Sequence, residues 1–221
     1  KLDDKSGKRL IDEILDVARQ KGTGMWTSQS AMELQVPVPT IDMAVAMRDL
    51  SVFEEQRQIA DKIFQHHEIN FKGDRKKFLR QLRKALYVSV ITTYAQGFAL
   101  LAAASDKYGY HLDLESVARI WRGGCIIRAA ILEDIQAAFN AKHDLLNLLL
   151  DHNLSEKIME NLEDLRKIVC RASTLGIPVP GIMASLGYLD AYRSSWLPAN
   201  LIQAQRDYFG AHTDERIDAK G

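Results

Sequence analysis

The sequence predicts an all-α fold, a helical domain with a long central helix and an internal duplication. Apolar residues recur with the helical period along nearly the whole chain, and no alternating run of useful strand length interrupts them. The uncharged stretch ALYVSVITTYAQGFALLAAA lies inside one unbroken helical pattern. A short Pro-Val-Pro motif also occurs twice, each time between two helical patterns.

The first helix is expected over residues 8–21, KRLIDEILDVARQK, and Gly22 is expected to end it. Its apolar face would consist of Leu10, Ile11, Ile14, Leu15, Val17 and Ala18. Thr27 or Ser28 can cap a short helix that ends near Leu34. The prolines of VPVPT then interrupt the helical pattern. A long helix is expected from Thr40 to about Gln65.

The central helix is expected to begin after Asp74, a good N-cap residue, and to continue to about Lys107. It would span roughly 50 Å at 1.5 Å per residue. Its middle carries little charge, so we expect it to be buried on most sides.

Five further helices complete the pattern. LDLESVARIWRGGC gives a short one ended by Gly123 and Gly124, and IIRAAILEDIQAAFN gives the next. Ser155 and Glu156 open a helix that Gly176 closes. IPVPGIMASLGYLDAYRSS forms another, and a last helix, PANLIQAQRDYFGAH, begins with Pro198 near its first position.

The repeated motif supports a duplicated helical unit. LQVPVPTIDMAVAM at 34–47 resembles LGIPVPGIMASLGY at 175–188, and both follow one helix and precede another. A residue before proline avoids the helical region, so each motif forces an extended link at an equivalent place.

Composition excludes several classes of protein. Of 221 residues, 29 are Lys or Arg and 29 are Asp or Glu, so net charge indicates neither a nucleic-acid nor a membrane partner. We see no signal peptide and no apolar run of membrane length, and we expect a cytoplasmic protein. Cys125 and Cys170 are expected to be reduced, buried thiols. The opening KLDDKSG, without an initiator methionine, suggests a processed or excised piece.

The glycines of QKGTGMWT do not form a dinucleotide loop. That loop needs GxGxxG between a strand and a helix, whereas Gly22 and Gly24 follow a helical pattern and Thr27 replaces the third glycine. We interpret GTG as a helix C-cap and turn. His66-His67 lacks a carboxylate or thiol at ligand spacing, so no metal site is expected. WRGGC suits tight helix packing as well as a ligand.

Four cationic or polar side chains next to unusual backbone are the candidate ligand residues, namely Lys21, Arg48, Arg206 and His212. Arginine binds phosphate through two parallel hydrogen bonds, lysine adds a point charge and histidine can donate to a hydroxyl. Together they would suit a phosphorylated, hydroxylated anion. Their spacing along the chain does not by itself show that they converge.

Four blocks resemble the carboxy-terminal helical domain of decarboxylating 6-phosphogluconate dehydrogenases: QKGTGMWTSQSAMEL, WRGGCIIR, IPVPGIMASLGYLDAYR and LIQAQRDYFGAHTDERID. They occur in the family's order, and the similarity runs from about Leu10 to the end. The resemblance implies an all-α domain with an internal duplication. It also implies that Lys21 binds substrate, that Arg48 contacts the substrate phosphate, and that Arg206 and His212 are donated to the neighbouring subunit's site.

The sequence departs from the family in two places. Met25 stands where the family usually has lysine, at a position that we do not carry over as a ligand. The family's amino-terminal half, which looks like a Rossmann domain and supplies the coenzyme loop and the catalytic lysine and glutamate, has no counterpart here. Residues 1–221 are therefore expected to be the substrate-binding and dimerisation domain, with no catalytic residue, and with a tail shorter than in many relatives.

The resemblance thus implies the carboxy-terminal portion of an enzyme that converts 6-phosphogluconate to ribulose 5-phosphate and CO2 with NADP or NAD and no metal. Such a protein would be a homodimer without nucleic-acid or membrane partners, and this chain alone would be inactive. An alternative is a stand-alone helical anion-binding or scaffold protein derived from that enzyme. Another β-hydroxyacid dehydrogenase is a third possibility, although such proteins generally lack the QKGTG and RDYFGAH blocks together.

Overall fold

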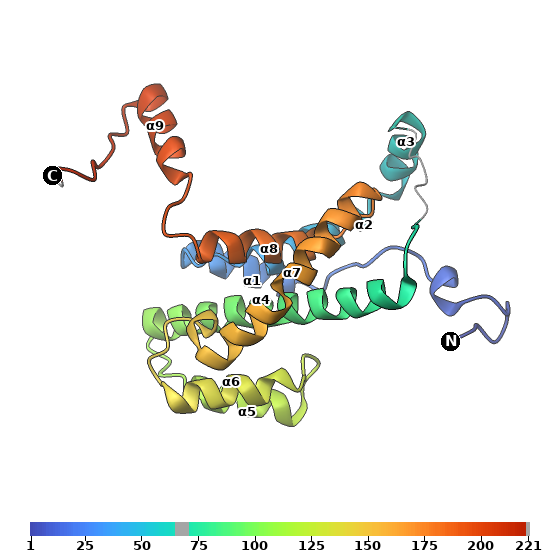
Figure 1. The fold of residues 1–221 in the computed structure, drawn as a ribbon, viewed down its shortest axis with the longest axis horizontal. Helices are drawn as coiled ribbons and strands as arrows, with labels where there is room; N and C mark the ends of the chain where they lie inside the picture. Colours follow the sequence, from blue (N-terminus) through green and yellow to red (C-terminus); the bar gives the residue numbers. More distant parts are fainter. Residues whose placement is uncertain (65–70, 220–221) are drawn as a thin grey trace. The chain divides into compact units, whose positions relative to one another are not determined.

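The computed structural model describes residues 1–64 and 71–219, and within these ranges the chain is helical without a β-strand. The α-helices are α1 (Thr23–Glu33), α2 (Pro39–Ser51), α3 (Glu54–Phe64), α4 (Arg75–Tyr108), α5 (Leu114–Gly124), α6 (Ile131–Ala141), α7 (His152–Thr174), α8 (Pro180–Tyr192) and α9 (Ala199–Gly210). Two short 3₁₀ helices are also present (Figure 1). η1 (Leu10–Glu13) precedes α1, and η2 (Leu148–Leu150) lies between α6 and α7. The predicted all-α class is confirmed. The chain forms two compact units, Lys1–Leu186 and Gly187–Gly221.

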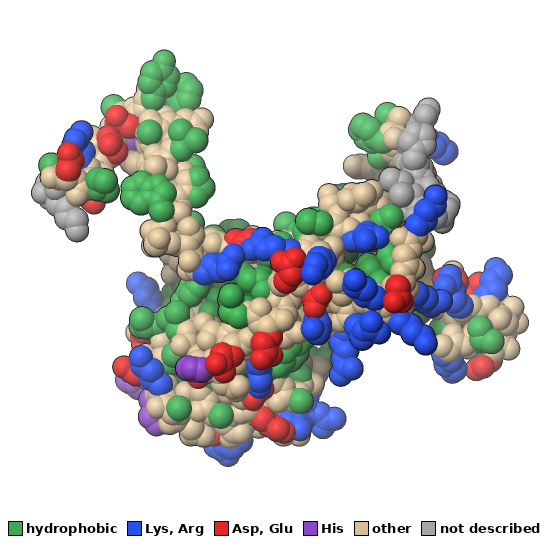
Figure 2. All heavy atoms as spheres, viewed as in Figure 1, with side chains coloured by type: hydrophobic (Ala, Val, Ile, Leu, Met, Phe, Trp, Pro, Cys, Tyr) green, Lys and Arg blue, Asp and Glu red, His purple; other side chains and the backbone are tan. Residues whose placement is uncertain are grey.

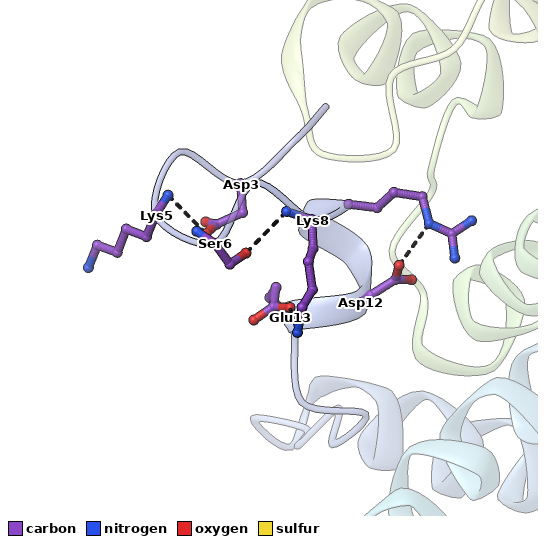
Figure 3. Close-up of polar contacts among 7 residues, drawn as sticks. Asp3, Lys5, Ser6, Lys8, Asp12 and Glu13 are labelled. Carbon is purple, nitrogen blue, oxygen red and sulfur yellow. Dashed lines mark hydrogen bonds and ion pairs between the residues drawn. The ribbon is translucent and has the colours of Figure 1, made fainter.

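The amphipathic helix expected over residues 8–21 does not form, so this prediction was wrong. Just before this segment, the carboxylate of Asp3 accepts hydrogen bonds from the backbone N–H groups of Lys5 (3.0 Å) and Ser6 (2.6 Å), and the chain turns there (Figure 3). Only the single turn of η1 follows, and the apolar side chains of this segment stay largely exposed. An amphipathic helix of this length is stable only when another element covers its apolar face.

Gly22 begins a helix and does not end one, which corrects the interpretation of GTG as a C-cap. Its φ of 101° lies in the region that favours glycine, and it occupies the N-cap position of α1. Its carbonyl accepts the N–H of Trp26 at 3.0 Å. The indole of Trp26 lies 3.6 Å from the place of a Cβ, so the turn is also closely packed.

The long helix expected from Thr40 is divided at Val52 into α2 and α3. The Ser51 hydroxyl donates to the carbonyl of Arg48 at 2.6 Å. In a continuous helix that carbonyl would accept the N–H of Val52, which bonds instead to Asp49, at 3.2 Å. Competition between a serine hydroxyl and the helical backbone therefore accounts for the break.

The central helix α4 agrees with the prediction at both ends. Asp74 accepts the N–H groups of Lys76 (2.8 Å) and Lys77 (3.1 Å), and Gly109 ends the helix at φ 67°. Contrary to expectation, α4 is long and apolar enough to cross a membrane by length and composition alone. Half of its most apolar window is buried inside the protein.

The core of the first unit forms where α7 packs along α4 and α5 pairs with α6 (Figure 1). Phe98 of α4 is buried and contacts Trp121 and Phe139, with ring centroids 5.2 and 5.3 Å apart. At the edge, the carboxylate of Asp164 accepts from Gln81 at 3.1 Å and pairs with Lys84 at 3.2 Å. Buried residues of α4 face α7, and others face α2, α5 and α6, as Gln96 and Phe98 do. The side of α4 that lines a groove with α1 stays partly open, so the helix is buried on most sides but not on all.

A buried polar chain joins α2, α4 and α8 within the first unit. Gln96 of α4 accepts the N–H of Thr40 and donates to its hydroxyl, each at 3.0 Å. The Thr40 hydroxyl lies 3.1 Å from that of Ser185, which donates to the carbonyl of Gly181 at 2.9 Å. Because each hydroxyl has one proton, Thr40 must donate to Ser185 and accept from Gln96.

The two Pro-Val-Pro links have the same conformation, as the predicted duplication requires. Gln35 and Gly176 occupy the same place in the two links, with φ of 56° and 67°. The next N–H in each link, from Val36 or Ile177, bonds back to the carbonyl five residues earlier at 2.9 Å. Each link then leads into a helix of 13 residues, α2 or α8. Both links are therefore Schellman-type helix ends that continue directly into a new helix.

Three smaller expectations need correction. Asp151, not Ser155, caps α7, because its carboxylate accepts the N–H of Leu154 at 2.9 Å. The helix expected from Ile126 begins only at Ile131, and Pro198 is the N-cap residue of α9.

The cysteine and glycine expectations also fail. Cys125 and Cys170 are free but exposed, because the first follows the end of α5 and the second lies off the buried stripe of α7. A Cβ on Gly123 or Gly124 would meet no atom within 4 Å, so packing in the described part of the chain requires neither glycine.

Candidate functional site

Lys21 lies in the extended segment that connects η1 to α1, directly before Gly22. Its side chain is exposed, and its ammonium group has no ion-pair partner among residues 1–64 and 71–219. The first N–H groups of α1 follow at once, and a helix N-terminus favours a negative charge. The segment therefore presents a lysine and a helix N-terminus side by side.

Arg48, on the last turn of α2, lies against the same segment. Its Nε donates to the carbonyl of Ala18 at 3.0 Å, and its Nη2 donates to that of Arg19 at 2.6 Å. Nη1 makes no hydrogen bond within the described part of the chain, so it is available to an anion. The structure thus places Arg48 against the segment that carries Lys21, although 27 residues separate the two in the sequence.

Further contacts between this segment and the end of α2 involve residues that the sequence did not single out. The N–H of Ala18 donates to the hydroxyl of Ser51 at 2.9 Å, and Gln20 donates its amide to the carboxylate of Asp49. Arg57 of α3 pairs with Asp16 at 2.7 Å. The hydrogen bond from Arg57 lowers the pKa of the Asp16 carboxyl, and its charge adds to this effect. No local sequence pattern reveals an ion pair between residues this far apart.

A largely apolar groove of about 980 Å³ begins at α1 and runs along the open side of α4. Trp26, Tyr94 and Trp121 line it, together with the turn that follows α5. The Tyr94 hydroxyl donates to the carbonyl of Ile127. Burial raises the pKa of Tyr94, which therefore stays protonated at neutral pH and serves as a hydrogen-bond donor. The groove has the volume of a ligand or peptide site.

Arg206 and His212 belong to the second unit, where a shared contact links them. Arg206 donates to the side-chain oxygen of Gln203 at 3.3 Å, and the Gln203 amide donates to the carbonyl of Thr213. Asp207 accepts the N–H of Thr213 at 2.8 Å, which closes the turn after α9. Gln203 thus connects Arg206 to the turn that carries His212.

The other candidate residues give no site. His66-His67 lies outside the described residues. Within them, no group of three or more His, Cys, Asp or Glu side chains could hold a metal ion.

Equal numbers of acidic and basic residues conceal one local concentration of positive charge. Figure 2 shows Lys and Arg side chains gathered where the first half of α4 meets α7. The cations that border the two hollows here are Lys77, Arg80, Arg83, Lys84, Lys167 and Arg171. Acidic neighbours on α7 partly neutralise them, since Lys84 pairs with Asp164 and Lys167 with Glu163. We interpret this region as surface charge.

The whole chain, residues 1–221, matches the family model described as "6-phosphogluconate dehydrogenase, C-terminal domain". It is 49% identical over 221 residues to a decarboxylating 6-phosphogluconate dehydrogenase of Staphylococcus epidermidis, covering 100% of this chain and 47% of that protein. It is 46% identical over 222 residues to an NADP(+)-dependent, decarboxylating 6-phosphogluconate dehydrogenase of Bacillus subtilis, with the same coverage.

A solved structure of Plasmodium falciparum 6-phosphogluconate dehydrogenase, described in its apo form and in complex with NADP+ or 6-phosphogluconate, is also similar. It superposes with a TM-score of 0.94 at 44% identity over 99% of this chain and 47% of that chain. The chain therefore spans about half the length of the relatives that it matches.

Proposed function

The chain belongs to the family of 6-phosphogluconate dehydrogenase C-terminal domains, and from this premise we propose that it forms the substrate-phosphate site and dimer surface of a decarboxylating 6-phosphogluconate dehydrogenase. The observation that carries the proposal is the position of Arg48, whose guanidinium group lies against the segment that holds Lys21. A phosphorylated sugar acid suits such a pairing, because an arginine and a lysine can each donate a charge-assisted hydrogen bond to its phosphate. The helix N-terminus of α1 adds N–H donors beside them.

Each of the two residues has a separate role in this proposal. Arg48 keeps Nη1 for the phosphate while Nε and Nη2 hold the backbone, so its guanidinium plane is fixed before substrate arrives. Lys21 is unpaired within the described residues, so it contributes charge without first breaking an ion pair. A preorganised cationic site avoids part of the ordering cost that binding otherwise requires.

Arg206 and His212 complete the site from the neighbouring subunit of a homodimer. Exposed apolar side chains on α9 support this part of the proposal (Figure 2). Tyr208 is 84% exposed and Phe209 77% exposed, which is unusual for adjacent aromatic residues in a monomer. The groove along α4 likewise offers an apolar surface to a partner.

The whole protein would oxidise 6-phosphogluconate at C3 and release CO2 to give ribulose 5-phosphate, in the cytoplasm. NADP, or else NAD, supplies the hydride acceptor. The described residues do not fit a coenzyme diphosphate, because Gly22 and Gly24 do not lie between a strand and a helix. The role of this chain is therefore to bind and orient substrate, and we expect no turnover from it alone.

Calorimetric titration of the chain with 6-phosphogluconate, and with unphosphorylated gluconate as control, tests the phosphate site. Binding of the first and much weaker binding of the second would support the proposal. Sedimentation at micromolar concentration tests the dimer. Equal affinity for the two acids would refute the phosphate assignment, and a monomer would refute the shared site. Binding by a protein whose native form has no coenzyme domain would favour the stand-alone anion-binding alternative.

A further inference from the structure

We propose that Asp16, Ser51 and Arg57 form a latch that positions Lys21 and Arg48 for the phosphate. The inference rests on the proposed function, because it concerns how that site is held. None of the three latch residues is a ligand in the proposal. They act through the segment between η1 and α1, which carries Lys21.

The segment depends on side-chain contacts because it has no regular structure of its own. η1 ends at Glu13 and α1 begins at Thr23, so no helical hydrogen bond fixes the residues between them. Nη1 of Arg57 pairs with the carboxylate of Asp16 at 2.7 Å and thereby fixes the start of the segment. Nη2 of the same arginine donates to the carbonyl of Ser51 at 3.2 Å, which ties the segment to the end of α2.

Ser51 links Arg48 to the segment that precedes Lys21. Its hydroxyl accepts the N–H of Ala18 at 2.9 Å and donates to the carbonyl of Arg48 at 2.6 Å. Arg48 in turn donates its Nε to the carbonyl of Ala18 at 3.0 Å. Both backbone polar groups of Ala18 are thus held by the end of α2, three residues before Lys21.

The position of Arg57 includes one unfavourable feature, an unsatisfied N–H group. Its Nε is buried without a hydrogen-bond partner in the described part of the chain, while its two terminal nitrogens make the contacts above. A buried, unsatisfied N–H is unfavourable, and such groups are uncommon in folded proteins. The arrangement is better explained by a positioning role than by optimisation of stability.

Without the latch, the segment would sample many conformations, and substrate binding would have to select the productive one. The apparent affinity falls in proportion to the population of the competent conformation. Loss of the Arg57 contacts should therefore weaken 6-phosphogluconate binding by about tenfold, a change expected if one conformation in ten remains competent.

The test is a double-mutant cycle on the 221-residue chain, read by calorimetric titration with 6-phosphogluconate. Arg57→Ala should raise the Kd about tenfold, and Arg57→Lys, which retains the charge opposite Asp16, should recover part of the loss. Lys21→Ala should abolish most of the effect of Arg57→Ala, because the latch acts through Lys21. Arg9→Ala is the matched control. It removes another exposed arginine–aspartate pair of 2.7 Å, to Asp12 (Figure 3), and should leave the Kd unchanged.

A second readout does not depend on the ligand. Amide hydrogen exchange at Ala18 should become faster in Arg57→Ala and in Ser51→Ala, and should stay unchanged in Arg9→Ala. If the unaltered chain does not bind 6-phosphogluconate, the proposed function fails, and the exchange rates still decide whether the latch exists. Unchanged exchange at Ala18 would overturn the latch. Faster exchange with an unchanged Kd, or additive effects with Lys21→Ala, would overturn its positioning role. Should Arg57→Ala not fold, Asp16→Asn provides the same comparison.

Discussion

Gln96 is a buried residue at which the structure predicts a large loss of stability without a change in volume. Gln96→Leu retains the side-chain size but removes both bonds to Thr40. The Thr40 N–H, one of the donors that an α-helix cannot satisfy internally, is then left unpaired in the core. The Thr40 hydroxyl keeps its bond to Ser185 but loses the amide donor. An unsatisfied buried donor costs about 1–3 kcal/mol, and a lost ordinary hydrogen bond about 0.5–1.5 kcal/mol.

The free energy of unfolding should therefore fall by about 2–4 kcal/mol. Urea denaturation followed by far-ultraviolet circular dichroism measures it, with Gln29→Leu as a control on the exposed face of α1. The control should change stability by less than about 0.5 kcal/mol. If Gln96→Leu behaved like Gln29→Leu, the buried chain of hydrogen bonds would not stabilise the junction of α2, α4 and α8, and the reasoning would be refuted.

Three further predictions concern single contacts. Arg48→Ala should weaken 6-phosphogluconate binding by about 1.5–3 kcal/mol in calorimetry; an unchanged affinity would remove Arg48 from the site. Asp74→Ala should lower the free energy of unfolding by about 1 kcal/mol, since α4 loses its N-cap; a smaller loss than that of an exposed mid-helix substitution would argue against the cap. Burial raises the pKa of the Asp164 carboxyl, but the hydrogen bonds from Gln81 and Lys84 together outweigh burial. The pKa therefore lies below its ordinary value of 3.8. Its contribution to stability is therefore present above this value and lost as the pH falls through the lowered pKa. Thermal midpoints of the protein and of Asp164→Asn should differ at pH 7, and the difference should shrink as the pH falls below 3.8; a constant difference would contradict the assignment.

Helices with their own start and stop signals could be predicted from the sequence. Asp74 begins α4 as expected, and the helix ends one residue beyond the expected Lys107, because capping depends on residues adjacent in the chain. The repeated Pro-Val-Pro links were equally predictable, since proline restricts its own φ and the conformation of the residue before it.

The errors arose where a contact between distant residues decides the local structure. The pattern over residues 8–21 has helical periodicity, but the chain there bonds instead to Ser51, Arg48 and Arg57, more than 25 residues away in sequence. The break in the helix expected from Thr40 has a local cause, the bond from the Ser51 hydroxyl to the carbonyl of Arg48, which periodicity alone does not reveal. Residue types identified Lys21 and Arg48 as candidates, but only the folded chain shows that Arg48 contacts the segment that carries Lys21. The pairing of Arg57 with Asp16 has no signature in the sequence.

The equivalence of the two Pro-Val-Pro links has a consequence for how the duplicated helices have diverged. The position of Arg48 in α2 corresponds to Leu189 in α8, whereas Asp49 and Asp190 remain identical. The left-handed residue is Gln35 in the first copy and Gly176 in the second, so the first copy keeps a costlier backbone. One copy thus carries a charged side chain at this position, and its counterpart carries an apolar one. The two copies therefore share a backbone conformation at the link, and only the first presents an arginine at this position of the following helix.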